Sequence, residues 1–214
     1  PGVARCWLVV SGIIQENGKR RYSFREEKVY MGRKRKPKME YRYYEIPAGS
    51  PVLALLGDKW VQNYGRDIDY LHFHNHLEVG FCYYGEGTVT FKEDIPFDGN
   101  MFTVIPKNFP HTTTSAGDSV SYWEWLFIDA DKFLREVYKD NPRMAQKVLD
   151  RVNRRAHFVR VQDKPQIGAL VQQIIGCMRE RKEFYLEEVK GLTLALLLQV
   201  ARWNREEAEK TEFE

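Results

Sequence analysis

The stretch from residue 71 to residue 87, LHFHNHLEVGFCYYGEG, limits what this chain can fold into more than any other. Side chains on a β-strand alternate between two faces, so even and odd positions lie on opposite sides. The even positions are His72, His74, His76 and Glu78. The odd positions are apolar or aromatic: Leu71, Phe73, Leu77, Val79, Phe81 and Tyr83. We therefore expect one face to carry chemistry and the other to pack.

The surrounding segments are typical of short strands. We expect strands at residues 41–46, 51–56, 71–84, 88–91, 101–105 and 119–128. Turn-rich segments with Gly or Pro separate them, at residues 47–50, 85–87, 96–100 and 106–110. Short strands at this spacing, without helices between them, indicate an antiparallel sandwich or barrel.

After residue 129 the apolar period changes from two to 3.6, which predicts helices at 131–138, 142–153, from 165 onwards and at 183–207, with a short strand at 157–161. The last helix is apolar on all sides, so it needs more than one neighbour. We expect the helix that starts at residue 165 and the β-structure to contact it, and a second copy of the chain is the economical cover for the rest, because broad apolar surfaces mark interfaces. The interface residues expected in such a homodimer are Val189, Leu192, Leu196, Val200 and Trp203.

Charge is distributed unevenly along the chain. Residues 1–38 hold 11 Lys and Arg against 3 Asp and Glu, a net +8, whereas the remainder holds 22 against 27, a net −5. Because residues 39–214 have a net negative charge, we do not expect their surface to bind nucleic acid. The basic run at 33–38 is either a nucleic-acid arm or part of a solvated, poorly ordered leader, and we favour the leader because charge blocks are usually disordered.

The three cysteines lie at no metal-like spacing, which suits a reducing compartment. No apolar run approaches the ~20 residues that span a bilayer. We expect a cytoplasmic protein with no membrane partner.

A second segment, Pro106 to His111, supplies a further candidate ligand. The pattern His72-x-His74-x-x-x-Glu78 together with Pro106-x-x-x-x-His111 resembles the two motifs of the cupin superfamily. The resemblance implies a mainly β fold, a double-stranded β-helix barrel. It also implies that His72, His74, Glu78 and His111 are the metal ligands, a set suited to Zn²⁺, Fe²⁺ or Mn²⁺.

Two positions depart from the cupin pattern: Asn108 stands where glycine is usual, and Ser115 where asparagine is usual. Neither change removes a ligand. His76 lies on the same face of the predicted strand as the ligands but is not part of the cupin motif. We therefore expect it to form hydrogen bonds beside the site or to lie on an exposed rim.

A cupin barrel beginning near residue 40 and followed by a pair of long apolar helices resembles the N-terminal sensing and dimerisation domain of AraC-type transcription regulators, over residues 40–210. This resemblance implies a pocket for a small effector, commonly a sugar, without metal or other cofactor. It places DNA binding in a helix-turn-helix pair C-terminal to this domain, which residues 1–214 do not supply. The expected parts are a basic arm (1–38), a barrel (39–129), a helical dimerisation region (130–208) and a linker (209–214).

The strand expected at 119–128 carries Glu124 among aromatic residues. It either contacts a polar effector or lies at the surface beside packing aromatics, since ligand sites combine apolar walls with a few polar groups. The effector-binding residues expected are His72, His74, Glu78, Tyr84, His111, Trp123 and Glu124. In this interpretation no residue is catalytic. The alternatives are a metal-dependent cupin enzyme, a dioxygenase or sugar isomerase using the same four ligands, and a storage or structural barrel.

Overall fold

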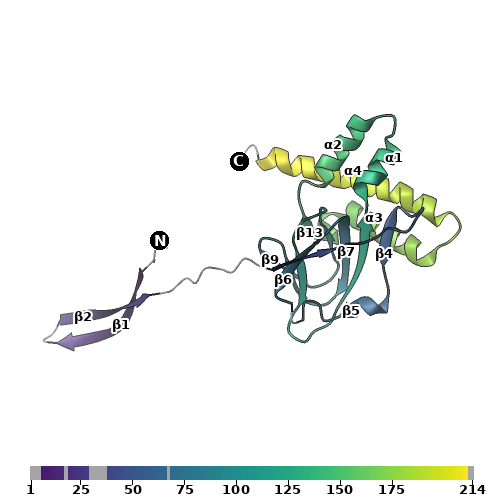
Figure 1. Ribbon diagram of the computed structural model, residues 1–214. Coiled ribbons are helices and arrows are strands. Elements are labelled where there is room, and N and C mark those ends of the chain that lie inside the picture. The colour runs from purple at the N-terminus through teal and green to yellow at the C-terminus, as the bar shows by residue number, and fades with distance from the viewer. Residues whose placement is uncertain (1–5, 17–18, 29–37, 67, 212–214) are drawn as a thin grey trace. The chain divides into compact units, whose positions relative to one another are not determined.

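The computed structural model describes residues 6–16, 19–28, 38–66 and 68–211, and the chain divides into two compact units, Pro1–Pro37 and Lys38–Glu214 (Figure 1). In the first unit, β1 (Cys6–Glu16) pairs with β2 (Lys19–Lys28) as an antiparallel hairpin. Residues 33–37 of the basic run lie outside the described residues.

The second unit is mainly β, followed by helices, which confirms the predicted fold class at this level. Its largest sheet has the order β13-β10-β7-β12-β4, and β5 also pairs with β12. These strands are β4 (Val52–Leu55), β5 (Val61–Gln62), β7 (Leu77–Tyr84), β10 (Met101–Val104), β12 (Ser121–Ile128) and β13 (His157–Arg160). Every pairing in this sheet is antiparallel.

Two smaller sheets complete the β-structure. One has the order β11-β8-β9, from β8 (Gly87–Thr90), β9 (Asp94–Phe97) and β11 (Thr112–Ser115). The other pairs β3 (Lys38–Arg42) with β6 (Tyr70–His74) in parallel. Isolated bridges at His72–His111 and Glu78–Ile105 connect the ladders.

The predicted strands differ from these in three places. The strand expected at 71–84 is broken at Asn75 and His76 into β6 and β7. The strand expected at 41–46 ends at Arg42, because the Asn75 side chain takes up both backbone groups of Tyr44: the Tyr44 N–H donates to Asn75 Oδ1 (3.0 Å), and Asn75 Nδ2 donates to the Tyr44 carbonyl (2.9 Å). The strands β5, β9 and β11 were not predicted, because polar and turn-forming residues obscure their periodicity.

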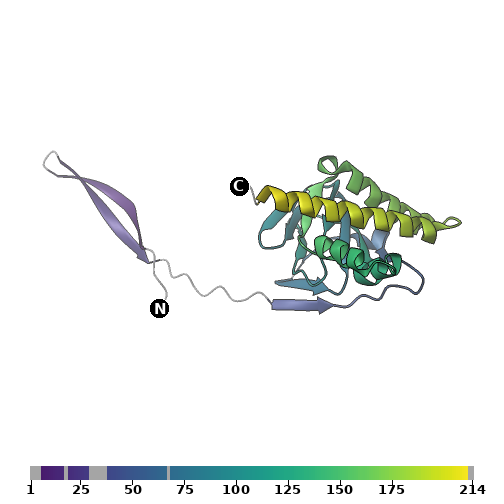
Figure 2. The same cartoon turned by 90° about the horizontal axis from the view of Figure 1, so that it is seen from above.

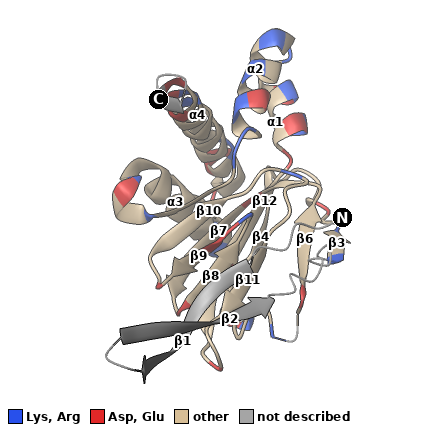
Figure 3. Ribbon diagram, turned by 90° about the vertical axis from the view of Figure 1, so that its left-hand side faces the viewer, with Lys and Arg blue, Asp and Glu red and all other residues tan. Residues whose placement is uncertain are grey.

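The helices are α1 (Ala130–Val137), α2 (Pro142–Val152), α3 (Pro165–Glu180) and α4 (Tyr185–Thr211), and 3₁₀ turns occur at Asp58–Trp60 and Val161–Asp163. The Asn141 side chain caps α2 by accepting from the Met144 N–H, and Pro142 is the first residue of the helix. Figures 2 and 3 show the helices gathered on one side of the β-structure, where α4 contacts both α2 and α3. No helix among the described residues is long and apolar enough to cross a membrane.

The apolar residues of α4 are covered mostly by this chain. Val189, Leu196 and Val200 are 0% exposed and Trp203 is 6% exposed, and all four belong to the core shared with the sheet and the other helices. Of the five residues expected at a dimer interface, only Leu192 remains partly accessible. The helix has more than one neighbour, as predicted, and α2 and α3 of the same chain are two of them.

The central strands β7 and β12 separate two apolar clusters. One cluster lies between the sheet and the helices, and includes Leu77, Val79, Phe81, Leu126 and Ile128. The other lies on the opposite face, and includes Cys82, Val89, Phe97, Trp123, Trp125 and Phe127. The sheet therefore has a helix-covered face and a second face, and the candidate site lies on the second.

Candidate metal and ligand-binding site

The four residues of the cupin-like pattern come together in space. His72 and His74 lie on β6, Glu78 on β7 and His111 just before β11, and one potential ligand atom from each lies within 4.8 Å of the others. His74, Glu78 and His111 are 0%, 3% and 1% exposed, whereas His72 is half-buried with its Nδ1 shielded from solvent. Residues as far apart in the sequence as His72 and His111 thus form one compact cluster.

Backbone hydrogen bonds hold the loop that carries His111 against β6. The N–H groups of His72 and His111 each donate to the other's carbonyl at 2.9 Å, and the Asn108 N–H donates to the His74 carbonyl at 2.8 Å. Asn108 has φ of 60°, in the left-handed region that asparagine tolerates better than other non-glycine residues. This explains how the chain keeps the turn without the glycine that is usual at this position.

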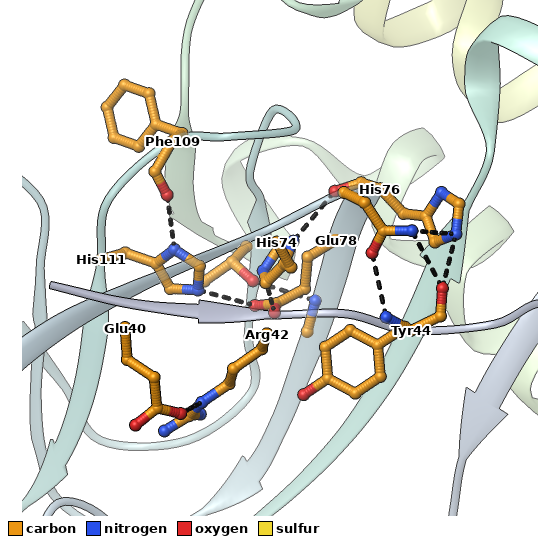
Figure 4. Close-up of polar contacts among 11 residues, drawn as sticks. Glu40, Arg42, Tyr44, His74, His76, Glu78, Phe109 and His111 are labelled. Carbon is orange, nitrogen blue, oxygen red and sulfur yellow. Dashed lines mark hydrogen bonds and ion pairs between the residues drawn. The ribbon is translucent and has the colours of Figure 1, made fainter.

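Two of the imidazoles are held in one tautomer (Figure 4). His74 Nδ1 lies 3.0 Å from the His76 carbonyl, and His111 Nδ1 lies 2.9 Å from the Phe109 carbonyl. A carbonyl only accepts, so each Nδ1 carries the proton that it donates. Each Nε2 therefore faces Glu78, at 2.8 Å from Oε2 for His74 and 3.5 Å from Oε1 for His111. Metal-ligating histidines are oriented by the same type of hydrogen bond from the second ring nitrogen.

The charges of the cluster are tightly linked. Burial lowers the pKa of His74, but the Glu78 carboxylate outweighs burial and raises it above the ordinary value. Burial raises the pKa of Glu78, but His111 and His74 outweigh burial and hold it well below its usual range. Burial, and then the charge of His111, lower the pKa of His72 to about 3. Glu78 and His74 thus favour each other's charged form, and a bound cation could replace the proton of His74 as the partner of Glu78.

The donor set fits a transition metal. Four buried atoms of the cluster have no hydrogen-bond partner among the described residues: His72 Nδ1, His74 Nε2, Glu78 Oε1 and His111 Nε2. Although His74 Nε2 is within ion-pair distance of Glu78, the two groups do not have hydrogen-bond geometry. Buried polar atoms are normally paired, so these atoms need an explanation. Three imidazoles and one carboxylate suit Zn²⁺, Fe²⁺ or Mn²⁺.

A cavity of about 270 Å³ opens over this cluster, and His72, Glu78 and His111 line it. Its walls include five aromatic residues: Tyr44, Trp60, Tyr64, Trp125 and Phe127. Polar side chains also line it: Arg42, Gln62, Asn63, Arg66, Thr112 and Thr113. The arrangement is typical of small-molecule sites, which combine apolar walls with a few converging polar groups.

Ser115, the second departure from the cupin pattern, fastens one wall of this cavity. Its Oγ accepts from the Tyr64 N–H at 3.0 Å, and its own N–H donates to the Tyr64 carbonyl at 2.9 Å. Ser115 Oγ also lies 3.0 Å from Ser121 Oγ on β12. The serine therefore ties the segment that contains Tyr64 to β11 and to the central sheet.

The other residues expected to bind an effector lie apart from the cluster. Glu124 is on the helix-covered face, where Arg179 of α3 donates to it. Trp123 is completely buried and stacks on Trp125 with ring centroids 4.9 Å apart, but it does not line the cavity. Tyr84 is 49% exposed and does not line the cavity either. His76 is turned away from the four, and its Nε2 lies 3.0 Å from the Tyr44 carbonyl.

Several residues that line the cavity were not predicted from the sequence. Arg42 lies on β3, and Trp60 and Tyr64 lie in or beside the short segments between β4 and β6. No periodic pattern marks these segments, so nothing in the sequence links them to the histidines. Alternation along β12 does predict that Trp125 and Phe127 share one face of the strand. The sequence does not show which face lines the cavity, because that depends on how the sheet packs in the folded protein.

Neither protein-family models nor curated proteins give a match to this chain. Similar solved structures include ToxT from Vibrio cholerae O395 (13% identity, 72% of this chain and 54% of that chain, TM-score 0.43). A second is ToxT bound to (E)-4-(8-methylnaphthalen-1-yl)but-3-enoic acid, with 12% identity over 72% of this chain and 57% of that chain and a TM-score of 0.44. A third is the AraC-like transcriptional activator CuxR, with 13% identity over 61% of this chain and 42% of that chain and a TM-score of 0.39. The chain spans about half the length of these structures. The functional proposal below rests on the geometry of the site.

Proposed function

We propose that this chain is the effector-binding part of an AraC-type transcription regulator. The observation that carries the proposal is that β7 and β12 face the cavity on one side and the helices on the other. Trp125 and Phe127 line the cavity, while Leu126, between them in sequence, packs in the cluster shared with the helices. A molecule that binds one arrangement of the cavity wall more tightly would therefore shift the sheet relative to α3 and α4.

The proposal includes the finer expectations from the sequence. The strands around the cluster form a cupin-like barrel over residues 39–129, and residues 130–208 transmit the signal and mediate a homodimer. A helix-turn-helix pair following residue 214 would contact DNA, and the protein would act in the cytoplasm. Leu192, half-buried on α4, is the residue of the expected interface best placed to contact a second copy.

A second candidate is a metal-dependent enzyme, and the four unpartnered atoms of the cluster favour it. His72, His74, Glu78 and His111 would hold the metal, and the aromatic walls would position a substrate and limit the access of water. A bound transition metal would supply Lewis-acid chemistry or an activated water molecule.

Hydrogen exchange on the purified chain tests whether a ligand bound in the cavity affects the helices, as the proposed sensing role requires. Phenylacetate and L-arabinose are suitable first probes, identified as bound by a rise in melting temperature. A bound probe should slow amide exchange in β7 and β12 and also change exchange in α3 and α4. Trp125→Leu should abolish the effect, whereas Tyr84→Phe, outside the cavity, should not. Changes confined to the cavity strands would contradict a sensing role.

Two measurements separate the remaining alternatives. Elemental analysis of protein prepared without added metal tests the proposal of a metal-dependent enzyme. A content of less than about a tenth of an equivalent of transition metal would exclude that proposal. Light scattering at roughly tens of micromolar protein tests the homodimer, and a monomer there would contradict it. Leu192→Arg should prevent association; Leu196→Arg is unsuitable, because Leu196 is completely buried and the change would disrupt folding.

A further inference from the structure

The charged residues around the cavity are mostly basic. Arg42 and Arg66 line it, whereas Glu78 is its one lining carboxylate among the described residues and lies between imidazoles. The Arg42 side chain is 32% exposed, and its Nε donates to Glu40 Oε1 at 2.7 Å, which holds the guanidinium in place (Figure 4). Glu40 itself does not line the cavity. Arg66 lies 3.5 Å from Asp118, but these side chains are 70% and 98% exposed, so the pair is weak and a bound anion can compete for the guanidinium.

Trp60 supplies a second feature of the same cavity. Its Nε1 is buried and has no hydrogen-bond partner among the described residues. An indole N–H is a donor only, so this group needs an acceptor. Trp60 lines the cavity, so an oxygen of a bound molecule can supply that acceptor.

We propose that the cavity binds a small carboxylate with an apolar or aromatic body. This inference rests on the proposed function and names the chemical class of the effector. The carboxylate accepts from Arg42 and from Trp60 Nε1, because a guanidinium matches carboxylate geometry and a negative oxygen is the stronger acceptor. The body of the ligand lies between the aromatic rings.

The size of the cavity restricts the ligand further. At about 270 Å³ it is close to the lower end of the range for small-molecule pockets, which starts at ~300 Å³. The inference departs from the neutral sugar that the family resemblance implied. A sugar would bring hydroxyl groups but no charge to match Arg42 and Arg66.

Phenylacetate and phenylacetamide test the charge directly, because the two molecules have nearly the same shape. Calorimetric titration of the full chain should show phenylacetate binding at least tenfold more tightly. Arg42→Gln should remove the preference, and Arg42→Lys should keep part of it. Arg160→Gln, which alters an arginine paired with Asp98 outside the cavity, should leave the preference intact. Added salt should weaken phenylacetate binding more than phenylacetamide binding.

Equal affinities for the two probes, a preference that survives Arg42→Gln in a folded variant, or no binding of either probe at ~10 mM would overturn the inference. Failure of the proposed function gives a different result. Phenylacetate binding that leaves hydrogen exchange in α3 and α4 unchanged would support the carboxylate site and contradict sensing. Binding of L-arabinose, but not phenylacetate, with altered exchange in those helices would contradict the carboxylate class and support sensing.

Discussion

Glu78 and Glu124 lie on adjacent strands of one sheet and are both buried, at 3% and 0% exposed, yet their surroundings differ completely. Glu124 faces the helices and accepts from four donors: the Gly57 N–H (2.8 Å), Tyr83 Oη (2.7 Å), Tyr122 Oη (2.8 Å) and Arg179 Nη2. Glu78 faces the cavity, and its Oε1 has no hydrogen-bond partner in the part of the chain that the structure describes. Burial alone therefore does not identify a functional carboxylate; the lack of matching donors does.

The pKa of each carboxyl is lowered, but for different reasons. Burial raises the pKa of Glu124, and hydrogen bonds from Arg179, Tyr83, Gly57 and Tyr122 outweigh it. Burial raises the pKa of Glu78, and the charges of His111 and His74 outweigh it. The donors around Glu124 are part of the fold, whereas the positive charge beside Glu78 is exchangeable. We infer that Glu124 stabilises the domain and that Glu78 is available for binding.

The largest expected effect is on folding. Glu124→Ala leaves Arg179 without its buried partner and removes the acceptor of the Gly57 N–H. We expect the free energy of unfolding to fall by about 3 kcal/mol, the low end of the range for breaking a buried ion pair, because Arg179 retains access to water. Urea unfolding followed by circular dichroism measures this. Zinc affinity of the folded variant should stay unchanged, and a parallel loss of zinc binding would contradict the separation of the two faces.

The next effect is on metal binding. Glu78→Gln keeps the shape of the side chain but removes a charged ligand, so we expect zinc affinity of chelator-treated protein to fall at least ~100-fold. Competition with a fluorescent chelator measures the affinity. Glu124→Gln is the matched control, since it changes the neighbouring carboxylate on the other face. If both variants bind zinc as tightly as the wild-type protein, the cluster is not a metal site.

The comparison also shows where sequence reasoning ends. Alternation along the strand placed His72, His74 and Glu78 on one face, because local periodicity fixes which side chains share a face. His111 was added by the resemblance to the cupin motifs, which periodicity alone does not provide. The break at Asn75 left that grouping intact and turned only His76 away. Glu124 was expected either to contact an effector or to lie at the surface, because aromatic residues flank it in the sequence. It instead accepts from Arg179, which lies 55 residues further along the chain, and no local pattern connects the two residues.

The same limit applies to the helices. The apolar surface of α4 was recognised, and its cover was divided between the preceding helix, the β-structure and, for the rest, a second copy of the chain. Contacts with α2 and α3 provide much of that cover, and they depend on how the helices pack. The cavity wall at Trp60 and Tyr64 was missed because it comes from short irregular segments that carry no period.

A smaller, pH-dependent effect is expected at His157, which is 7% exposed and lies outside the cavity. Its Nε2 is 2.6 Å from Asn204 Oδ1 on α4, and its ring stacks on Trp203 with centroids 3.6 Å apart. Burial lowers the pKa of His157, against the opposing effect of the Asn204 hydrogen bond, and Arg155, Glu207 and Lys164 are the charged groups that act on it. The folded state therefore binds fewer protons than the unfolded state below the unfolded pKa of ~6.5.

Stability should consequently fall as the pH drops below ~6.5 towards the folded pKa of this histidine. His157→Gln lacks the titrating group, so the stability difference between the wild-type protein and the variant should shrink as the pH is lowered from 7 to about 5. Urea midpoints at several pH values measure the difference. A difference that stays constant over this range would show that His157 does not contribute to the acid sensitivity.

The smallest effect is expected at Asp98, which accepts from Arg160 at 2.8 Å and resembles the Glu124–Arg179 pair in chemistry. The two side chains are 53% and 44% exposed, so water competes for both charges and a surface ion pair contributes little to stability. Asp98→Asn should leave the urea midpoint close to that of the wild-type protein, whereas Glu124→Gln should lower it clearly. Both changes remove one negative charge beside an arginine, so burial and the number of donors are the main differences between them. Equal losses would show that the charge, and not the buried network of four donors, sets the importance of Glu124.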